Sequence, residues 1–388
     1  MREVVIVDAV RTPFGRRGGS YAEAHSAHVL GDTLESLLAR HPGFDPAELG
    51  QVIAGCVGQV GMQASNIGRV AWLSAGLPIA VPATTIDAQC GSSQQAFNLA
   101  ANAIAAGAQD SAIACGVELM SRVPMGATVP KDGSLGKPIT RRYWQHQEFT
   151  TQFEGAERIA DRWGLTRDDC DGFAKSSQDR AAAAIAGGRF DSQLVTIDVP
   201  SDDGRATTTL TTDQTPRPTD LDTLAGLKPT GRPDGVHTAG SSSQIADGAS
   251  AALLMSAVRA EALGLDPIAR VVDTAFVGSD PVLMLTGPID ATEQLLTRNA
   301  LTMADIAVTE INEAFASVVL AWQQECGPDM ARVNPNGGAI SLGHPLGGTG
   351  TSLIAKAAHE LRSQAGGYGL VTMCCGGGMA TGTLIQGL

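Results

Sequence analysis

The feature that most constrains this chain is a structural unit that occurs twice along it. In the first half, an apolar run ends in DAQCGSS at residues 87–93; an alanine-rich helix to about Ala106 and a strand over 111–116 follow. In the second half, GGA at 337–339 leads to GHPLGGTG at 343–350; a helix to about Arg362 and a strand over 369–373 follow. Two such halves would place reactive residues at matching ends of their elements, which is where sites in α/β sheets are usually assembled.

The rest of the chain favours an α/β fold. Short β-branched runs, VVIVDAV at 4–10 and QVIAGCV at 51–57, alternate with helical stretches near residues 26–40 and 64–75. This is the pattern of crossover helices that cover a sheet. Residues 122–147 are polar and rich in proline and glycine, so we expect an excursion from the core there and an inserted lobe over about 120–250.

Composition and charge exclude several function classes. The formal net charge is −13 and no stretch clusters lysine and arginine, so the chain would repel nucleic acid. No apolar run is long enough to span a bilayer, and the N-terminus is typical of a first strand rather than a signal peptide. We therefore expect a cytoplasmic protein with no membrane contact. The seven cysteines form no CxxC pair, which supports neither a disulfide framework nor a metal site.

Four residues are candidates for chemistry, and each also has a purely structural interpretation. Cys90 precedes a helix whose first N–H groups would stabilise a thiolate, or it is a small buried hydrophobe. His344 lies in a loop as a base, or as a solvated side chain. Cys374 precedes three glycines that would bind an oxyanion or form a tight turn. Asn312 would orient a water or a histidine, or cap a helix. Signatures of nucleotide, dinucleotide and serine-hydrolase sites are absent, which leaves thiol chemistry.

The chain resembles the thiolase family from VDAVRTPFG at 7–15 to the C-terminal strand. The resemblance rests on four blocks in order: QCGSS at 89–93, NEAF at 312–315, GHPLG at 343–347 and CCGGG at 374–378. It implies a thiolase fold, with duplicated βαβαβαββ halves in a five-layered α-β-α-β-α arrangement and an inserted loop domain. The corresponding domains are residues 1–119 with 250–267, the loop domain 120–249, and residues 268–388. It also implies a homo-oligomer, a dimer or a dimer of dimers, with the excursion at 122–147 as its tetramerisation region.

The resemblance further implies an acyltransferase that works by ping-pong transfer through a cysteine. Cys90 would attack the 3-keto carbon of a 3-ketoacyl-CoA while His344 takes its proton. Cys374 would protonate the departing enolate and later deprotonate coenzyme A. One oxyanion hole would pair His344 with a water held by Asn312, and the other would use the N–H groups of Cys90 and Gly376. Coenzyme A is then a co-substrate, and no prosthetic group or metal is implied.

The same resemblance assigns contacts to coenzyme A. TAGSSS at 238–243 is similar to the family's pantetheine-binding segment, which implies contacts from Ala239 and Ser243. Arg217 and Thr219 match the segment that meets the nucleotide end, where an arginine suits a phosphate. Gln152 and Phe315 complete the implied set.

The substrate class is predicted from a segment in which this chain departs from the family pattern. Short-chain biosynthetic thiolases carry His-Met-Gly where this chain has TQFEGAE at 151–157. With VHTAG at 236–240, this departure resembles the thiolases of actinobacterial steroid breakdown. It predicts a degradative enzyme for bulky or steroid-derived substrates, which would release acetyl-CoA or propionyl-CoA.

Three alternatives remain open at this point. An acetyl-CoA C-acetyltransferase would make acetoacetyl-CoA with the same residues. A related Cys-His-Asn condensing enzyme typically lacks the second cysteine, which is present here as Cys374. A non-catalytic acyl-CoA or lipid carrier should have lost a reactive residue, and all are present.

Overall fold

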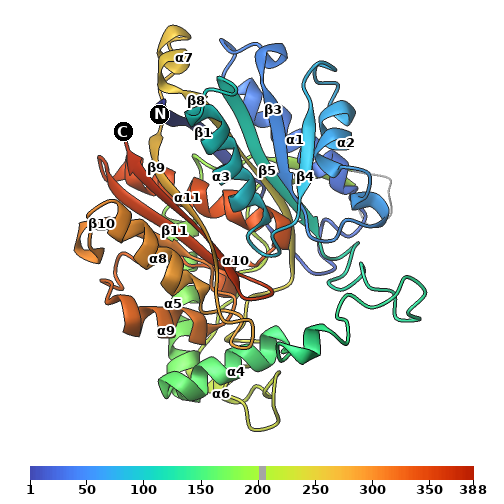
Figure 1. The fold of residues 1–388 in the computed structure, drawn as a ribbon, viewed down its shortest axis with the longest axis vertical. Coiled ribbons are helices and arrows are strands. Elements are labelled where there is room, and N and C mark those ends of the chain that lie inside the picture. Colours follow the sequence, from blue (N-terminus) through green and yellow to red (C-terminus); the bar gives the residue numbers. More distant parts are fainter. Residues whose placement is uncertain (201–206) are drawn as a thin grey trace.

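The computed structural model describes residues 1–200 and 207–388. Two similar halves form the body, and the chain between them builds a lobe (Figure 1). No helix within the described ranges is long and apolar enough to cross a membrane.

The first half has the predicted βαβαβαββ order. Its elements are β1 (Val4–Arg11), α1 (Ser26–Ala39), β3 (Gln51–Gly55), α2 (Ile67–Ser74), β4 (Ala83–Ile86), α3 (Ser92–Ala105), β5 (Ser111–Leu119) and β8 (Ala246–Ser256). Strands β3, β4 and β5 are parallel, whereas β8 runs antiparallel to both β5 and β1. Since β1, β5 and β8 are buried along their whole length, they carry continuous apolar runs instead of an alternating pattern. A short strand, β2 (Gly15–Arg16), pairs with the start of β8, and a short helix, α7 (Ala257–Ala262), follows it.

The second half repeats this order, except that one strand is reduced to a bridge. Its elements are β9 (Ala269–Gly278), α8 (Gly287–Arg298), β10 (Ile306–Ile311), α9 (Ala316–Cys326), α10 (Ala339–Leu342), α11 (Thr349–Ser363), β11 (Gly367–Cys375) and β12 (Met379–Gly387). In place of a strand equivalent to β4, a single parallel bridge joins Val333 to Thr309. The chain after Val333 cannot extend this strand, because Asn334 and Gly337 have positive φ and Pro335 lacks an N–H group.

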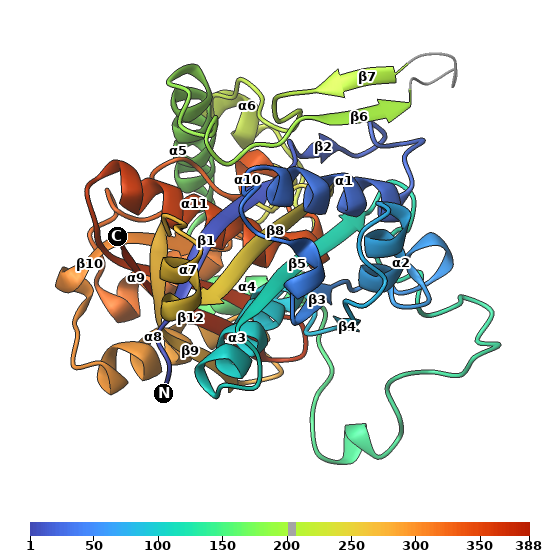
Figure 2. The same cartoon turned by 90° about the horizontal axis from the view of Figure 1, so that it is seen from above.

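The layers follow from where the apolar faces pack. Helices α1 and α2 cover one face of the first half's strands, with Leu34 and Trp72 fully buried. Helices α3 and α11 lie between the strands of the two halves. Helices α8 and α9 cover the outer face of the second half, where Trp322 is fully buried. Figures 1 and 2 show the resulting α-β-α-β-α order, and pairing of β1 with β9 makes the two sheets continuous.

The two central helices touch where they begin. A Cβ atom on Gly350, in the first turn of α11, would lie 2.2 Å from the backbone nitrogen of Gln94, in the first turn of α3. Only a glycine permits this approach. Because Cys90 precedes α3 and His344 precedes α11, the contact brings both residues to one region.

The lobe contains α4 (Gln152–Trp163), α5 (Arg167–Ala186), the hairpin β6 (Ile197–Pro200) with β7 (Thr207–Leu210), and α6 (Leu221–Ala225). Thr151 caps α4 and Thr166 forms a capping box at α5, which fixes both N-termini. Residues 122–147 hold only a short 3₁₀ turn (Tyr143–Gln145) and project from the body, as Figure 2 shows. The loop-domain limit proposed between residues 249 and 250 lies inside β8.

Candidate active site

Cys90 lies on a strained turn between β4 and α3. Gln89 has φ of 53°, a left-handed conformation that is uncommon outside glycine, and Cys90 is partly buried. A Cβ atom on Gly91 would lie 2.4 Å from Cys375 Sγ, so the glycine lets the second half approach this turn. The turn therefore presents Cys90 to the residues at the end of β11.

Burial decides the protonation state of Cys90. It raises the pKa of the thiol to about 11, and the N–H groups of Gly376 and Cys90 itself offset this only in part. Burial thus outweighs the N–H groups that favour the thiolate. Cys90 is a thiol at neutral pH, and it needs a base to become a nucleophile.

His344 carries a neutral imidazole that can accept a proton. His344 follows Gly343, whose φ of +89° sharply turns the chain at the end of α10. The backbone N–H group of His344 donates to the carbonyl oxygen of Gln244 at 2.9 Å. The side chain is buried, which lowers its pKa to about 4, so the imidazole is neutral. The interpretation of His344 as a solvated loop residue is wrong.

Asn312 faces His344. Its Nδ2 atom lies 3.5 Å from His344 Nε2, and within the described residues its buried Oδ1 atom has no hydrogen-bond partner. An uncompensated buried amide oxygen is unusual and is available to a water molecule or a substrate. The alternative interpretation of Asn312 as a helix cap is wrong, because α9 starts after Phe315 and has no side-chain cap.

Glu313 and Glu118 hold the His344 loop from its two sides. The buried Glu313 carboxylate accepts hydrogen bonds from Ser177 Oγ at 2.6 Å and from the backbone N–H of Ile340 at 3.1 Å, in α10. The buried Glu118 carboxylate accepts from the backbone N–H of Gly347 at 3.0 Å and from Gln63 Nε2 at 2.6 Å. These carboxylates bind main chain on both sides of His344 and make no bond to its ring.

Cys374 and Cys375 end β11 beside Cys90. Burial raises the pKa of both thiols, and a charge on Cys90 would raise each of them further. Cys374 packs among apolar residues that include Phe315, whereas Cys375 packs toward Gly91. Gly377 and Gly378 have φ of 86° and 75°, so they form the tight turn to β12. The interpretation of these glycines as a tight turn is therefore confirmed, while oxyanion binding stays a prediction. The N–H group of Gly376 lowers the pKa of the Cys90 thiol.

His344 lines a cavity of about 440 Å³. Five of the six predicted coenzyme A contacts line it, namely Gln152, Arg217, Ala239, Ser243 and Phe315. Thr219 does not line it. The segment 238–243 is tied to the Asn312 segment, because the N–H of Ser243 donates to the carbonyl oxygen of Ala314 at 2.9 Å.

Sequence reasoning missed several residues of this cavity. These are Arg16, Arg17, Met120, Met125, Thr230 and Leu346, together with Ser242, Gln244 and Ile245. Leu346 could have been found from its place in GHPLG. Ser242 lies within the TAGSSS segment, and Gln244 and Ile245 follow it directly. The rest are brought in by segments far apart in the sequence, such as β2 and the end of β5, and no local pattern marks them.

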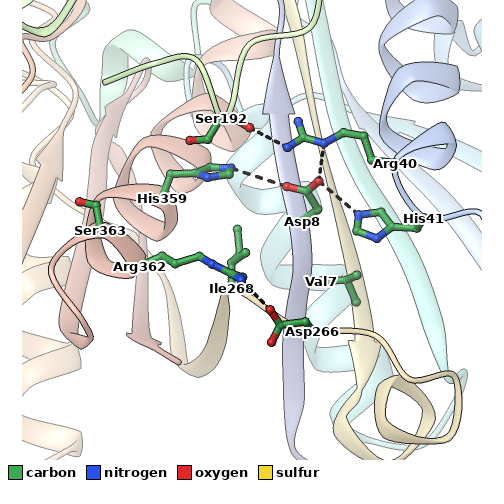
Figure 3. A pocket seen from close by; sticks show the side chains of 10 residues that line it. All are labelled: Val7, Asp8, Arg40, His41, Ser192, Asp266, Ile268, His359, Arg362 and Ser363. Carbon is green, nitrogen blue, oxygen red and sulfur yellow. Dashed lines mark hydrogen bonds and ion pairs between the residues drawn. The ribbon is translucent and has the colours of Figure 1, made fainter. Parts of the chain in front are cut away.

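A second cavity, of about 500 Å³, shares no residue with the first. Asp8 lies at its centre, with Arg40, His41 and His359 directed at its carboxylate (Figure 3). Although burial would raise the pKa of Asp8, hydrogen bonds from His359 and His41 and the charge of Arg40 hold it well below its ordinary value. Arg362 pairs with Asp266. The charged side chains of this cavity therefore pair with one another. These pairs link β1, α1 and α11.

Comparisons with known proteins agree with this geometry. Residues 4–258 match the thiolase N-terminal domain and residues 265–387 match the thiolase C-terminal domain. The chain belongs to the thiolase family. Thiolases are acyltransferases, and this thiolase has the family fold over its whole length.

Individual relatives cover nearly all of the thiolase. It is 44% identical over 394 residues to a steroid 3-ketoacyl-CoA thiolase of Mycobacterium tuberculosis, FadA6. This alignment covers 100% of this chain and 95% of the relative. It is 39% identical over 403 residues to a beta-ketoadipyl-CoA thiolase of Acinetobacter baylyi, with both chains fully covered. Among solved structures, an acetyl-CoA acetyltransferase of Bacillus anthracis superimposes with a TM-score of 0.92 at 34% identity, over 100% of this chain and 99% of the other. The human mitochondrial 3-ketoacyl-CoA thiolase gives 0.90 at 31% identity, with the same coverage.

Proposed function

We propose that this thiolase is a degradative enzyme that cleaves a bulky 3-ketoacyl-CoA with coenzyme A. Two observations support the proposal: the Cys90 and Cys374 thiols lie close enough for a charge on Cys90 to raise the pKa of Cys374, and the start of α11, which follows the neutral His344, contacts the start of α3. Cys90 comes from the first half, and His344 and Cys374 come from the second. A carbon–carbon cleavage that expels an enolate needs a nucleophile, its base and a separate acid.

In the first half-reaction, the Cys90 proton passes to His344 and the sulfur attacks the 3-keto carbon. The negative charge that develops on the keto oxygen is stabilised by the protonated His344 and by a water molecule on Asn312. The bond between C2 and C3 then breaks, the acyl group stays on Cys90 as a thioester, and the electron pair remains on C2. The Cys374 thiol donates its proton to C2, which releases acetyl-CoA or propionyl-CoA and leaves Cys374 as a thiolate.

In the second half-reaction, the Cys374 thiolate takes the thiol proton of coenzyme A. The coenzyme sulfur attacks the acyl-Cys90 thioester, and the N–H groups of Cys90 and Gly376 stabilise the oxyanion. Collapse expels the Cys90 sulfur, which recovers its proton from His344. All three side chains return to their starting states, so the cycle balances.

The cavity supplies the surroundings for coenzyme A. Three arginines line it, Arg16, Arg17 and Arg217, in a chain whose net charge is −13. Such a local excess of cations favours a phosphorylated ligand. Ala239, Ser243, Gln152 and Phe315 would contact the pantetheine arm, which leads toward His344.

The bulky substrate class is supported by the steroid thiolase relative and by the wall of the cavity. Gln152 stands in the segment where short-chain thiolases carry His-Met-Gly, and its Nε2 atom contacts Met125 Sδ at 3.6 Å. Met120, Phe153 and Leu346 add apolar surface. Methionine side chains adapt to large apolar ligands of irregular shape.

A second candidate substrate carries a terminal carboxylate. The beta-ketoadipyl-CoA thiolase relative and the pair Arg16 and Arg17 on the cavity wall favour it. An arginine pair would bind a carboxylate as readily as a phosphate.

A product panel separates these candidates. The purified protein is incubated with coenzyme A and one of four substrates: acetoacetyl-CoA, a long straight-chain 3-ketoacyl-CoA, a steroid side-chain 3-ketoacyl-CoA or 3-oxoadipyl-CoA. Products are measured by mass spectrometry, with Cys90→Ala as the inactive control and Cys326→Ala as a control for loss of a different thiol. Fastest cleavage of the steroid substrate supports the proposal.

The other outcomes are equally specific. Turnover of acetoacetyl-CoA alone would make the protein an acetyl-CoA acetyltransferase. Fastest cleavage of 3-oxoadipyl-CoA would favour the second candidate. Cleavage of none would contradict the catalytic proposal and favour an acyl-CoA carrier.

We also propose that the protein is a homo-oligomer, a dimer or a dimer of dimers. The excursion at 122–147 exposes large apolar side chains, among them Leu135 at 82% and Trp144 at 56%. An apolar surface of this kind is typical of a contact region. Light scattering of the purified protein tests this, and a monomer would contradict it.

A further inference from the structure

Within the described residues, the imidazole of His344 contacts a hydroxyl group and an amide group but no carboxylate. Its Nδ1 atom lies 2.6 Å from Thr349 Oγ1, and its Nε2 atom lies 3.5 Å from Asn312 Nδ2. His344 and Thr349 are both buried, so bulk water does not compete for these contacts. A neutral imidazole carries one N–H group, and its partners decide which nitrogen holds it.

Thr349 has a second contact that fixes where its own proton goes. Oγ1 lies 2.8 Å from the carbonyl oxygen of Pro345, one turn back along the chain. A carbonyl oxygen only accepts hydrogen bonds, so the single hydroxyl proton of Thr349 must point to it. The opposite orientation would bring two oxygen lone pairs together at that distance.

Only one position of the imidazole proton then fits the remaining contact, between Thr349 Oγ1 and His344 Nδ1. With its proton committed to Pro345, Oγ1 can only accept from His344, so Nδ1 must carry the imidazole proton. Nε2 is left with its lone pair, which agrees with the amide nitrogen of Asn312 on that side. The three contacts of Thr349 Oγ1 and of the His344 ring nitrogens are thus compatible with one arrangement and not with its alternative.

We propose that Thr349 is a positioning residue that holds neutral His344 as the Nδ1–H tautomer, so that Nε2 is the atom that accepts the Cys90 proton. This inference rests on the proposed function, in which His344 is the base. After the transfer, Nε2–H donates to the substrate oxyanion while Nδ1–H stays on Thr349. One orientation of the ring therefore serves both steps.

The inference explains why contacts hold the His344 loop on both of its sides. Thr349 is the first residue of α11, and Gly348 donates its N–H to the same Pro345 carbonyl at 2.9 Å. Glu118 binds Gly347 in this turn. Loop and helix start are thus fixed as a unit, and the hydroxyl cannot follow an alternative rotamer without losing the Pro345 bond.

Kinetics of matched variants provide the first test. Thr349→Val keeps the shape of the side chain and removes the acceptor, whereas Thr349→Ser keeps the hydroxyl. Ser352→Ala is the control, because Ser352 is buried in the same turn and its hydroxyl binds the carbonyl oxygen of Thr349 without contacting His344. Loss of a hydrogen-bond partner that orients a metal-binding histidine typically costs about 10–100-fold, and we expect the same range for the partner of His344.

We expect Thr349→Val to lower kcat by about 10–100-fold with little change in KM. Thr349→Ser should stay within about threefold of the unmodified enzyme, and so should Ser352→Ala. A Thr349→Val enzyme with unchanged kcat would overturn the proposal. Thr349→Ser and Thr349→Val enzymes with equal losses would also overturn it, because the effect would then come from packing.

Neutron diffraction from deuterium-exchanged crystals tests the tautomer without any turnover. Deuterium on His344 Nδ1 supports the proposal, and deuterium on Nε2 alone overturns it. The two experiments separate this inference from the proposed function. A protein that cleaves no 3-ketoacyl-CoA would refute the function, while the neutron map still decides the tautomer. If Thr349→Val does not fold, the neutron map and the Thr349→Ser enzyme still decide the matter.

Discussion

The buried ion pair between Lys356 and Glu310 makes a strong prediction about stability. Lys356 Nζ on α11 lies 2.6 Å from Glu310 Oε2 on β10 and 2.6 Å from the carbonyl oxygen of Gly337. The side chains are 3% and 0% exposed. Burial raises the pKa of Glu310 from 4.5 to about 7, even though Lys356 lowers it. The pair therefore joins the central helix to the second sheet and to the segment that precedes His344.

Lys356→Met removes the cation and keeps the apolar stem. Breaking one partner of a buried pair costs about 3–5 kcal/mol, because the other charge is left uncompensated. The loss must depend on pH. The folded variant keeps Glu310 protonated to higher pH than the unfolded chain does, so its stability falls as pH rises above the unfolded pKa.

The size of this pH dependence follows from the titration of one proton, on Glu310. The free energy of unfolding should fall by about 1.4 kcal/mol per pH unit, or about 4 kcal/mol between pH ~5.5 and pH ~8.5. Lys356→Met with Glu310→Gln lacks the titrating group, so this double variant should recover most of the stability and lose that slope.

Urea unfolding at fixed protein concentration measures both quantities through the fluorescence of the buried Trp72 and Trp322. The pH dependence of all other groups cancels between the single and the double variant. The reasoning is refuted if both variants show the same pH dependence, or if Lys356→Met costs less than about 1 kcal/mol at pH ~8.

Three further predictions concern the site. Gly350→Ala places a Cβ atom 2.2 Å from the Gln94 nitrogen, so it should cost about 1–3 kcal/mol in thermal unfolding and also lower kcat; an unchanged Tm would contradict the close helix contact. Cys374→Ala should lower kcat by about 10²–10⁴-fold while Cys90 still reacts with iodoacetamide, and loss of both would point to misfolding. Because burial raises the pKa of Cys90 to about 11, its alkylation rate in a His344→Asn variant should rise about tenfold per pH unit from pH ~7 to ~9, and a flat profile would indicate a standing thiolate.

Local patterns in the sequence predicted most of the fold. The helix α3 begins after the DAQCG turn and ends beside Ala106, as the sequence predicts, and the repeated unit gives matching halves. The loss of the β4 equivalent was not predicted, because it depends on the backbone conformation at Asn334 and Gly337. Dihedral angles of this kind are set by tertiary contacts.

Sequence motifs proposed the residues of the candidate site, but they did not predict its electrostatics. The four sequence blocks meet, but the pKa of Cys90 is raised where a helix N-terminus predicts the opposite. Burial is a property of the packed halves, and the N–H groups near Cys90 offset it only in part. The role proposed for Thr349 could not be predicted from the sequence either, because it depends on two distances around one hydroxyl group.

The most direct test of the central claim is to trap the acyl group. The enzyme is mixed with a 3-ketoacyl-CoA without free coenzyme A, quenched, digested and analysed by mass spectrometry. We predict one acyl group per chain on the peptide that contains Cys90, with release of an equal amount of acetyl-CoA or propionyl-CoA. An acyl group on Cys374, or release of product without any acyl-enzyme, would contradict the account.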